Sequence, residues 1–368
     1  MLYYLVNHVL AKILYFPGIN LFRYITFRSV AGAVIAFLIS LYFGPRVIHQ
    51  LKRLKIGQII RNTVGGPNLG AMHKAKSGTP TMGGILILIA LMVPILLLCD
   101  FSNRLVGLTV LVTLWLGLVG FLDDYLKLMK RQSEGLNPRQ KMGLQLILGL
   151  IVGVYLFIFP IIPEQRYLYF PFFKHLSPDI SWLYIPFAMM VIVSTSNAVN
   201  LTDGLDGLAI GCVTTSALSY LVMTYVIGRS DFAAYLNVPY VPGAGELTVV
   251  VSCLIGASLG FLWYNCHPAK VFMGDTGSLA LGGILGIIAL LIKQEFSLFI
   301  VGGIFVMEAL SVIIQVTSFK LRGKRVFLMS PIHHHFEKAG IKEETIIVRF
   351  WIISAILALI GLGLLKVR

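Results

Sequence analysis

Long apolar segments recur along the whole of this 368-residue chain and constrain its fold more than any other feature. Runs of about 18 or more apolar residues are long enough to cross the hydrocarbon core of a bilayer. Charged residues make up only 12% of the chain, whereas soluble domains carry about 25%. Inside lipid, only helices and closed barrels satisfy their own backbone groups. The sequence therefore predicts an all-α, polytopic integral membrane protein with a single domain over residues 1–368.

Hydropathy predicts about ten membrane-spanning helices. They centre on residues 30–43, 82–99, 105–122, 142–159, 182–197, 208–227, 247–264, 279–292, 298–317 and 346–365. The four cysteines form no CxxC pair, so neither a disulfide framework nor a zinc site is expected.

An even number of spans sorts the connecting loops into two sets, one on each side of the membrane. The loops at 44–81, 123–141, 199–207, 265–277 and 318–345 carry about 19 of the 30 Lys and Arg residues, so the positive-inside rule predicts that they are cytoplasmic. The net charge of +14 is thus interpreted as membrane orientation, and no nucleic-acid partner is expected. Every polar cluster of the sequence falls in these same loops, which predicts a site on the cytoplasmic face.

Two of the clusters are rich in aspartate. Asp123 and Asp124 directly follow an apolar span and could hold Mg²⁺ or supply a general base, although a position at the membrane interface would also explain them. Segment 197–207 places two carboxylates, two amides and two glycines in one short loop, more than helix capping requires. If this segment begins the next helix, Asp203 and Asp206 lie on one side of its first turn.

A third cluster, residues 265–278, leads into another span. Thr276 or Ser278 can cap the helix that follows, whose N-terminus favours a nearby phosphate. Asp275 beside that phosphate would be a natural Mg²⁺ ligand. Phe272 suits a stacking platform for a nucleobase, and an aromatic anchor at the membrane interface is an equally good interpretation.

The last two clusters are basic or rich in histidine. Segment 73–84 suits phosphate recognition, although attraction to lipid headgroups explains its lysines almost as well. Three consecutive histidines at 333–335 cannot all face one metal from a helix, because successive side chains are about 100° apart. They suit pyrophosphate donors better than a zinc site, with a solvated patch as the alternative. Within the bilayer, Glu308 and Gln315 share a helix face, which we expect to look into the bundle or a cavity.

Together these groups describe a site for a polyanion and a metal, and so phosphoryl transfer at the lipid–water boundary. The motifs at 123–124, 197–209, 271–278 and 333–335 resemble the polyprenyl-phosphate N-acetylhexosamine-1-phosphate transferase family. Segments 73–84 and 330–337 are similar to the branch of that family that uses UDP-N-acetylmuramoyl-pentapeptide. The resemblance covers nearly the whole chain in motif order.

The resemblance implies ten transmembrane helices with both termini outside, a homodimer, and a bacterial inner membrane enzyme whose active site faces the cytoplasm. Undecaprenyl phosphate would attack the sugar-side phosphorus of UDP-N-acetylmuramoyl-pentapeptide, so that lipid I forms and UMP leaves. This is the first membrane step of peptidoglycan synthesis.

By motif position, the resemblance implies that Asp123 is the base that keeps the lipid phosphate ionised, with Asp124 beside it, and that Asp275 binds Mg²⁺. The implied uridine pocket contains Lys76, Gly204, Leu205, Asp206, Asn265 and Phe272. The implied remainder of the site contains Thr81, Asn200, Asp203, Gln315, His333, His334 and His335.

Three other functions compete with this interpretation. A sister transferase that uses UDP-N-acetylglucosamine is the nearest, and segments 73–84 and 330–337 argue against it. A CDP-alcohol phosphotransferase requires a further Asp pair, yet no Asp or Glu lies between Ala209 and Arg229. A secondary transporter would place its carboxylates near the membrane midplane, whereas here they cluster at one rim.

Overall fold

The computed structural model describes residues 21–53, 78–130, 135–173 and 176–366. Within these ranges the chain is a helical bundle, and nine described helices are long and apolar enough to cross a membrane. A tenth and shorter apolar helix, α5 (Gly84–Leu98), packs among them. The predicted all-α, polytopic membrane fold is confirmed. The nine helices are α3 (Ile25–Arg53), α6 (Arg104–Lys130), α7 (Pro138–Ile158), α8 (Tyr184–Thr202), α9 (Leu208–Ile227), α11 (Ala244–Asn265), α12 (Gly274–Leu291), α14 (Gly303–Arg322) and α16 (Glu343–Gly363).

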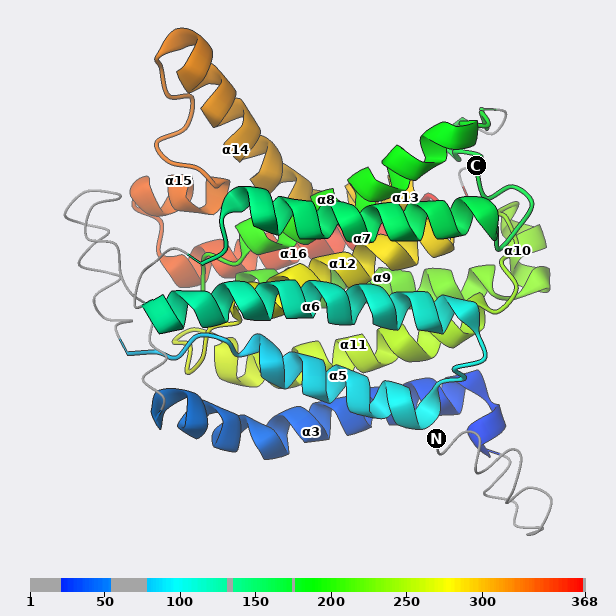
Figure 1. The fold of residues 1–368 in the computed structure, drawn as a ribbon, viewed down its shortest axis with the longest axis horizontal. Coiled ribbons are helices and arrows are strands. Elements are labelled where there is room, and N and C mark those ends of the chain that lie inside the picture. The colour runs from blue at the N-terminus through cyan, green and yellow to red at the C-terminus, as the bar shows by residue number, and fades with distance from the viewer. Residues whose placement is uncertain (1–20, 54–77, 131–134, 174–175, 367–368) are drawn as a thin grey trace.

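Two helices form the centre of the bundle. α11 packs most extensively on α3 and α9, and α12 on α6 and α8. In α12, 89% of the apolar span is buried, against 22% in α14. α14 accordingly leans away from the other helices (Figure 1). α3 begins and α16 ends at the same end of the bundle, as an even number of crossings requires (Figure 1).

Short helical elements complete the described part of the chain. They are η3 (Ser181–Leu183), α10 (Ser230–Leu236), α13 (Glu295–Val301) and α15 (Ile332–Lys338). α15 carries the three histidines and lies at the end of the bundle opposite α10 (Figure 1).

Several helix ends differ from those expected. α6 continues through Asp123 and Asp124, because their carboxylates find partners inside the protein and need no exposed loop. The expected span 298–317 is broken at Gly302 into α13 and α14. α8 extends over Asn200, so residues 203–207 form a turn before α9 and the two aspartates do not share a helix turn.

A buried ion pair lies just after α12, at the end of that helix opposite Asp275. Lys293 Nζ is 2.7 Å from Glu295 Oε1, and both side chains are fully buried. The same ammonium group donates to the Gln165 carbonyl at 3.1 Å, and the Gln165 amide donates to the Tyr184 hydroxyl at 2.8 Å. This pair therefore ties α12 and α13 to the segment before α8.

Candidate active site

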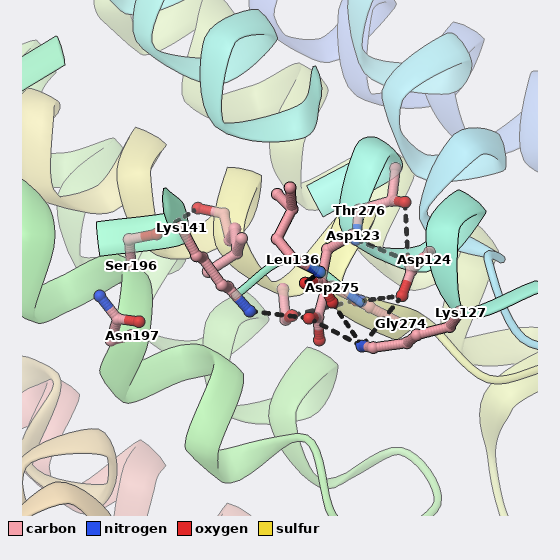
Figure 2. Close-up of polar contacts among 12 residues, drawn as sticks. Asp123, Asp124, Lys127, Leu136, Lys141, Ser196, Asn197, Gly274, Asp275 and Thr276 are labelled. Carbon is pink, nitrogen blue, oxygen red and sulfur yellow. Dashed lines mark hydrogen bonds and ion pairs between the residues drawn. The ribbon is translucent and has the colours of Figure 1, made fainter. Parts of the chain in front are cut away.

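Three aspartates from two helices meet at one end of the bundle (Figure 2). Asp123 and Asp124 lie in α6, and Asp275 lies in the first turn of α12. One carboxylate oxygen from each lies within 4.8 Å of the other two, so the cluster could hold a metal ion. A Cβ on Gly120 would overlap the backbone carbonyl of Asp275. Only glycine at this position allows α6 to approach α12 so closely.

Asp124 fastens α6 to the beginning of α12. Its Oδ2 accepts hydrogen bonds from the Thr276 amide at 3.0 Å and the Thr276 hydroxyl at 2.8 Å, and its Oδ1 accepts one from the Asp275 amide at 3.3 Å. These amides are among the four at a helix start that have no partner within the helix. The expected cap by Thr276 or Ser278 is therefore wrong. The Asp124 carboxylate, from the neighbouring helix α6, caps α12 instead. The Ser278 hydroxyl is not a cap, because it lies inside α12 and donates to the Gly274 carbonyl.

Two lysines balance the aspartates, and neither is among the site residues expected from the sequence. Lys127 Nζ lies 2.5 Å from Asp123 Oδ2, 3.0 Å from Asp275 Oδ2 and 3.6 Å from Asp124 Oδ1. Lys141, in the first turn of α7, lies 2.7 Å from Asp275 Oδ2 (Figure 2). Asp275 thus has two ammonium partners and is 17% exposed, whereas Asp123 and Asp124 are buried.

Asp203 is a fourth carboxyl group beside the cluster. Burial raises its pKa to about 8, and the charges of Asp275 and Asp124 act in the same direction. A backbone hydrogen bond from Gly274 opposes this shift. In the absence of a bound cation, Asp203 therefore holds its proton at neutral pH.

The raised pKa of Asp203 makes stability depend on pH. Between about pH 4 and pH 8, the folded protein keeps a proton on Asp203 that the unfolded chain has lost, so the free energy of unfolding falls as pH rises. We expect the Tm in chelator to drop more between about pH 5 and pH 9 for the wild type than for Asp203→Asn. Parallel changes in Tm for the two proteins would contradict the assignment.

The second aspartate of this turn, Asp206, lies in a separate cluster. Its Oδ2 accepts a hydrogen bond from the Ala269 amide at 3.0 Å and lies 3.2 Å from His267 Nδ1. His267 Nδ1 is also 3.8 Å from Glu343 Oε1, and Glu343 accepts a hydrogen bond from the Asp206 amide at 3.1 Å. The structure thus joins Asp206 to the loop after α11 and to the beginning of α16.

Asn265 fixes the same turn from the other side. Its Oδ1 accepts a hydrogen bond from the Gly207 amide at 3.1 Å, and its Nδ2 donates to the Val271 carbonyl at 2.8 Å. Gly207 has a φ of +78°, in the left-handed region that favours glycine. In this structure Asn265 therefore positions the backbone of the turn against that of the 265–273 loop.

Thr81 and Phe272 lie on two neighbouring chain segments that are joined by backbone hydrogen bonds. The Phe272 amide donates to the Pro80 carbonyl and the Gly83 amide donates to the Phe272 carbonyl, both at 2.8 Å. The Phe272 side chain is half-buried. A Cβ on Gly274 would lie 2.7 Å from Asp124 Oδ2 and 3.1 Å from Thr81 Oγ1, so Thr81 adjoins the aspartate cluster.

The three histidines have three different partners. His333 Nδ1 lies 3.1 Å from Glu308 Oε1, and His334 Nδ1 lies 2.5 Å from Glu337 Oε2. His335 Nδ1 accepts a hydrogen bond from the Leu328 amide at 3.1 Å. The three rings thus have separate hydrogen-bond partners, although those of His333 and His334 lie 4.2 Å apart, centroid to centroid.

The other expected site residues have varied positions. Gln315 accepts hydrogen bonds from the Val326 and Phe327 amides, both at 2.9 Å, and so holds the loop after α14. Asn200 is half-buried in the last turn of α8, and Leu205 is buried in the turn before α9. Gly204 lies against His333. Lys76 is outside the described residues.

The helical bundle carries at one rim a cluster of carboxylates and lysines that could hold a metal ion and a polyanion. Residues 106–293 match the family model described as glycosyl transferase family 4. Residues 76–88 match signature 1 of the phospho-N-acetylmuramoyl-pentapeptide-transferases.

Curated relatives narrow this class to one family. A phospho-N-acetylmuramoyl-pentapeptide-transferase of Citrifermentans bemidjiense is 53% identical over 95% of this chain and 96% of its own length. Those of Geobacter sp. (strain M21) and Desulfotalea psychrophila are 52% and 53% identical, over 100% and 96% of this chain and 100% and 97% of their own lengths. The chain belongs to the phospho-N-acetylmuramoyl-pentapeptide-transferase family and is an enzyme of that kind.

Proposed function

We propose that the enzyme transfers phospho-N-acetylmuramoyl-pentapeptide from its UDP-linked form to undecaprenyl phosphate at the rim that carries Asp123, Asp124 and Asp275. The lipid phosphate oxygen forms a bond to the sugar-side phosphorus, the bond from that phosphorus to the UMP oxygen breaks, and lipid I and UMP are the products. One pyrophosphate linkage replaces another, so no ATP is required. The observation that carries the proposal is the convergence of these carboxylates with two lysines at the N-terminus of a buried helix.

The chain's own residues supply charge and orientation for this step. The lipid phosphate is already a nucleophile near neutral pH, so the protein has mainly to bind and align two polyanions. We assign to Asp123 the removal of a residual proton from the lipid phosphate. Lys127 and Lys141 can turn from Asp275 toward phosphate oxygens, since both are partly exposed.

A divalent cation fits the same cluster. Three carboxylates whose oxygens lie within 4.8 Å of one another are the hard oxygen donors that Mg²⁺ prefers. Asp275 would hold it, because this carboxylate is the most exposed of the three. When bound, Mg²⁺ neutralises negative charge on the pyrophosphate.

We assign the uridine pocket to the residues around the 203–207 turn and the 265–273 loop. The hydrogen bonds of Asn265 hold these two segments together, which supports a shared pocket. The half-buried ring of Phe272 would stack on the uracil. The pocket would consist of Lys76, Gly204, Leu205, Asp206, Asn265 and Phe272.

Replacing Phe272 by alanine should weaken binding of the nucleotide substrate. Stacking of a base on an aromatic ring is worth about 1–3 kcal/mol, so we expect the KM for that substrate to rise about 10-fold while kcat changes little. Phe272→Tyr, which keeps the ring, should behave as the wild type. Steady-state kinetics check this, and an unchanged KM for the alanine variant would contradict stacking.

We further propose that this rim faces the cytoplasm in the bacterial inner membrane and that the enzyme is a homodimer. The concentration of Lys and Arg in the loops at this end supports the orientation. The dimer rests on the resemblance alone. Cysteine-accessibility labelling in intact cells would test the orientation, and light scattering of the detergent complex would test the dimer.

The direct experiment mixes the purified full chain in detergent with undecaprenyl phosphate, Mg²⁺ and UDP-N-acetylmuramoyl-pentapeptide. Release of UMP with formation of a lipid-linked product is expected. UDP-N-acetylglucosamine in place of the peptide-bearing substrate should give no UMP. The opposite preference would favour the sister transferase.

A further inference from the structure

Glu308 has a position that the proposed reaction does not yet use. It lies in α14, and its side chain is fully buried. Its Oε1 lies 3.1 Å from His333 Nδ1, and its Oε2 accepts a hydrogen bond from the Ile332 amide at 2.9 Å. One carboxylate therefore fixes both the beginning of α15 and the ring of the first histidine in it.

The other nitrogen of His333 has no hydrogen-bond partner among the described residues. His333 is fully buried, and its Nε2 is an unpaired polar atom. A Cβ on Gly204 would overlap this atom, so Nε2 faces the backbone of the 203–207 turn. Because an unsatisfied buried nitrogen is costly, it requires an explanation such as a ligand at that position.

The neighbouring histidines lack this combination. His334 Nδ1 pairs with Glu337 on its own helix, at 2.5 Å. His335 Nδ1 accepts a hydrogen bond from the Leu328 amide. Of the three, only His333 is held by a carboxylate from a different helix, α14, and only His333 directs a buried nitrogen toward the turn that contains Asp203.

We propose that Glu308 is a positioning residue that keeps a proton on Nδ1 of His333 and so aims Nε2 at a substrate phosphate oxygen beside Gly204. The proposal rests on the proposed function, because that reaction supplies the phosphate. A carboxylate that accepts from Nδ1–H sets both the ring orientation and the tautomer, as carboxylates do for the histidines of triads and metal sites. If Nε2 carries a proton it donates to the phosphate, and if not it accepts from a protonated one.

The first test replaces Glu308 by glutamine, which keeps the size and the bond to the Ile332 amide but loses the charge. We expect kcat to fall about 10- to 100-fold, as when an orienting partner of a histidine is removed, with KM for the nucleotide substrate little changed. Glu295→Gln is the matched control, because it also removes a buried carboxylate, at the other end of α12. It should lower the Tm while kcat per folded enzyme stays at the wild-type value.

A double-mutant cycle separates positioning from a structural role. His333→Asn leaves a donor for Glu308 but no atom at the Nε2 position, so it should fold and be nearly inactive. Adding Glu308→Gln to it should change kcat by less than about twofold, because Glu308 acts through His333. Additive losses would overturn the proposal, as would a wild-type kcat for Glu308→Gln.

If Glu308→Gln does not fold, His333→Asn alone tests whether Nε2 takes part in the reaction. A kcat near that of the wild type would show that Nε2 has no part in the reaction. Failure of the proposed function looks different, since the wild-type enzyme itself would then release no UMP from UDP-N-acetylmuramoyl-pentapeptide.

Discussion

Asp275→Asn is expected to lower kcat by about 1,000-fold, the upper range for loss of one electrostatic group in an active site. The Asp275 carboxylate forms ion pairs with both Lys127 and Lys141, and it is the proposed Mg²⁺ ligand. An amide can neither balance two ammonium groups nor replace a carboxylate at a hard cation. The variant should still fold, because α12 is capped by the Asp124 side chain and not by that of Asp275.

The measurement is UMP release by purified enzyme, with the Tm recorded alongside. Asp231→Asn is the matched control, because Asp231 is exposed in α10 and its partner is Arg229, on the same short segment. It should leave kcat within about twofold of the wild type, as expected of a surface ion pair. Normal Mg²⁺-dependent turnover by Asp275→Asn would refute its proposed role.

The convergence of the site could be predicted from the sequence because two of its determinants are local. Apolar runs mark the helices, and acidic residues next to them mark one rim. Asp123, Asp124 and Asp275 were therefore expected on one face, and the structure brings their carboxylates together. The assignment of roles to these residues stays a prediction, as does the single domain over residues 1–368.

The charge partners could not be predicted in the same way, because ion pairs between helices depend on three-dimensional packing. In the sequence, Lys141 adds only to the positive charge of the 123–141 loop. In the structure, its ammonium group lies 2.7 Å from Asp275 Oδ2. Lys127 gave a usable signal, since a lysine four residues after Asp123 lies on the same helix face. Hydropathy hides that signal, because it ends the predicted span at residue 122, before the helix itself ends.

Glu308 shows the same limit. The seven-residue spacing of Glu308 and Gln315 predicts one helix face that looks into the protein. For Glu308 this prediction is confirmed, because its side chain is fully buried. Its partner His333 is 25 residues further on, across the loop after α14. No periodicity in the sequence connects these two positions, and only the packing of α15 against α14 reveals the pair.

The charge balance of the rim leads to the second large effect. Asp123, Asp124 and Asp275 face two ammonium groups, and Asp203 would add a further negative charge if its proton were displaced. The substrates add one phosphate group, on the lipid, and one pyrophosphate, on the nucleotide. The lysines alone cannot neutralise these groups together with the carboxylates, so the proposed divalent cation would supply the positive charge that brings the two polyanions together.

Removal of divalent cations with EDTA should therefore reduce UMP release to background, a loss of at least about 100-fold. Adding excess Mg²⁺ should restore it, whereas Ca²⁺ should restore less, because Ca²⁺ is larger and tolerates irregular coordination. Chelation should leave the Tm of the substrate-free enzyme nearly unchanged, since Lys127 and Lys141 already pair with the carboxylates. Undiminished turnover in EDTA would show that the two lysines suffice, and it would remove the metal from the proposed mechanism.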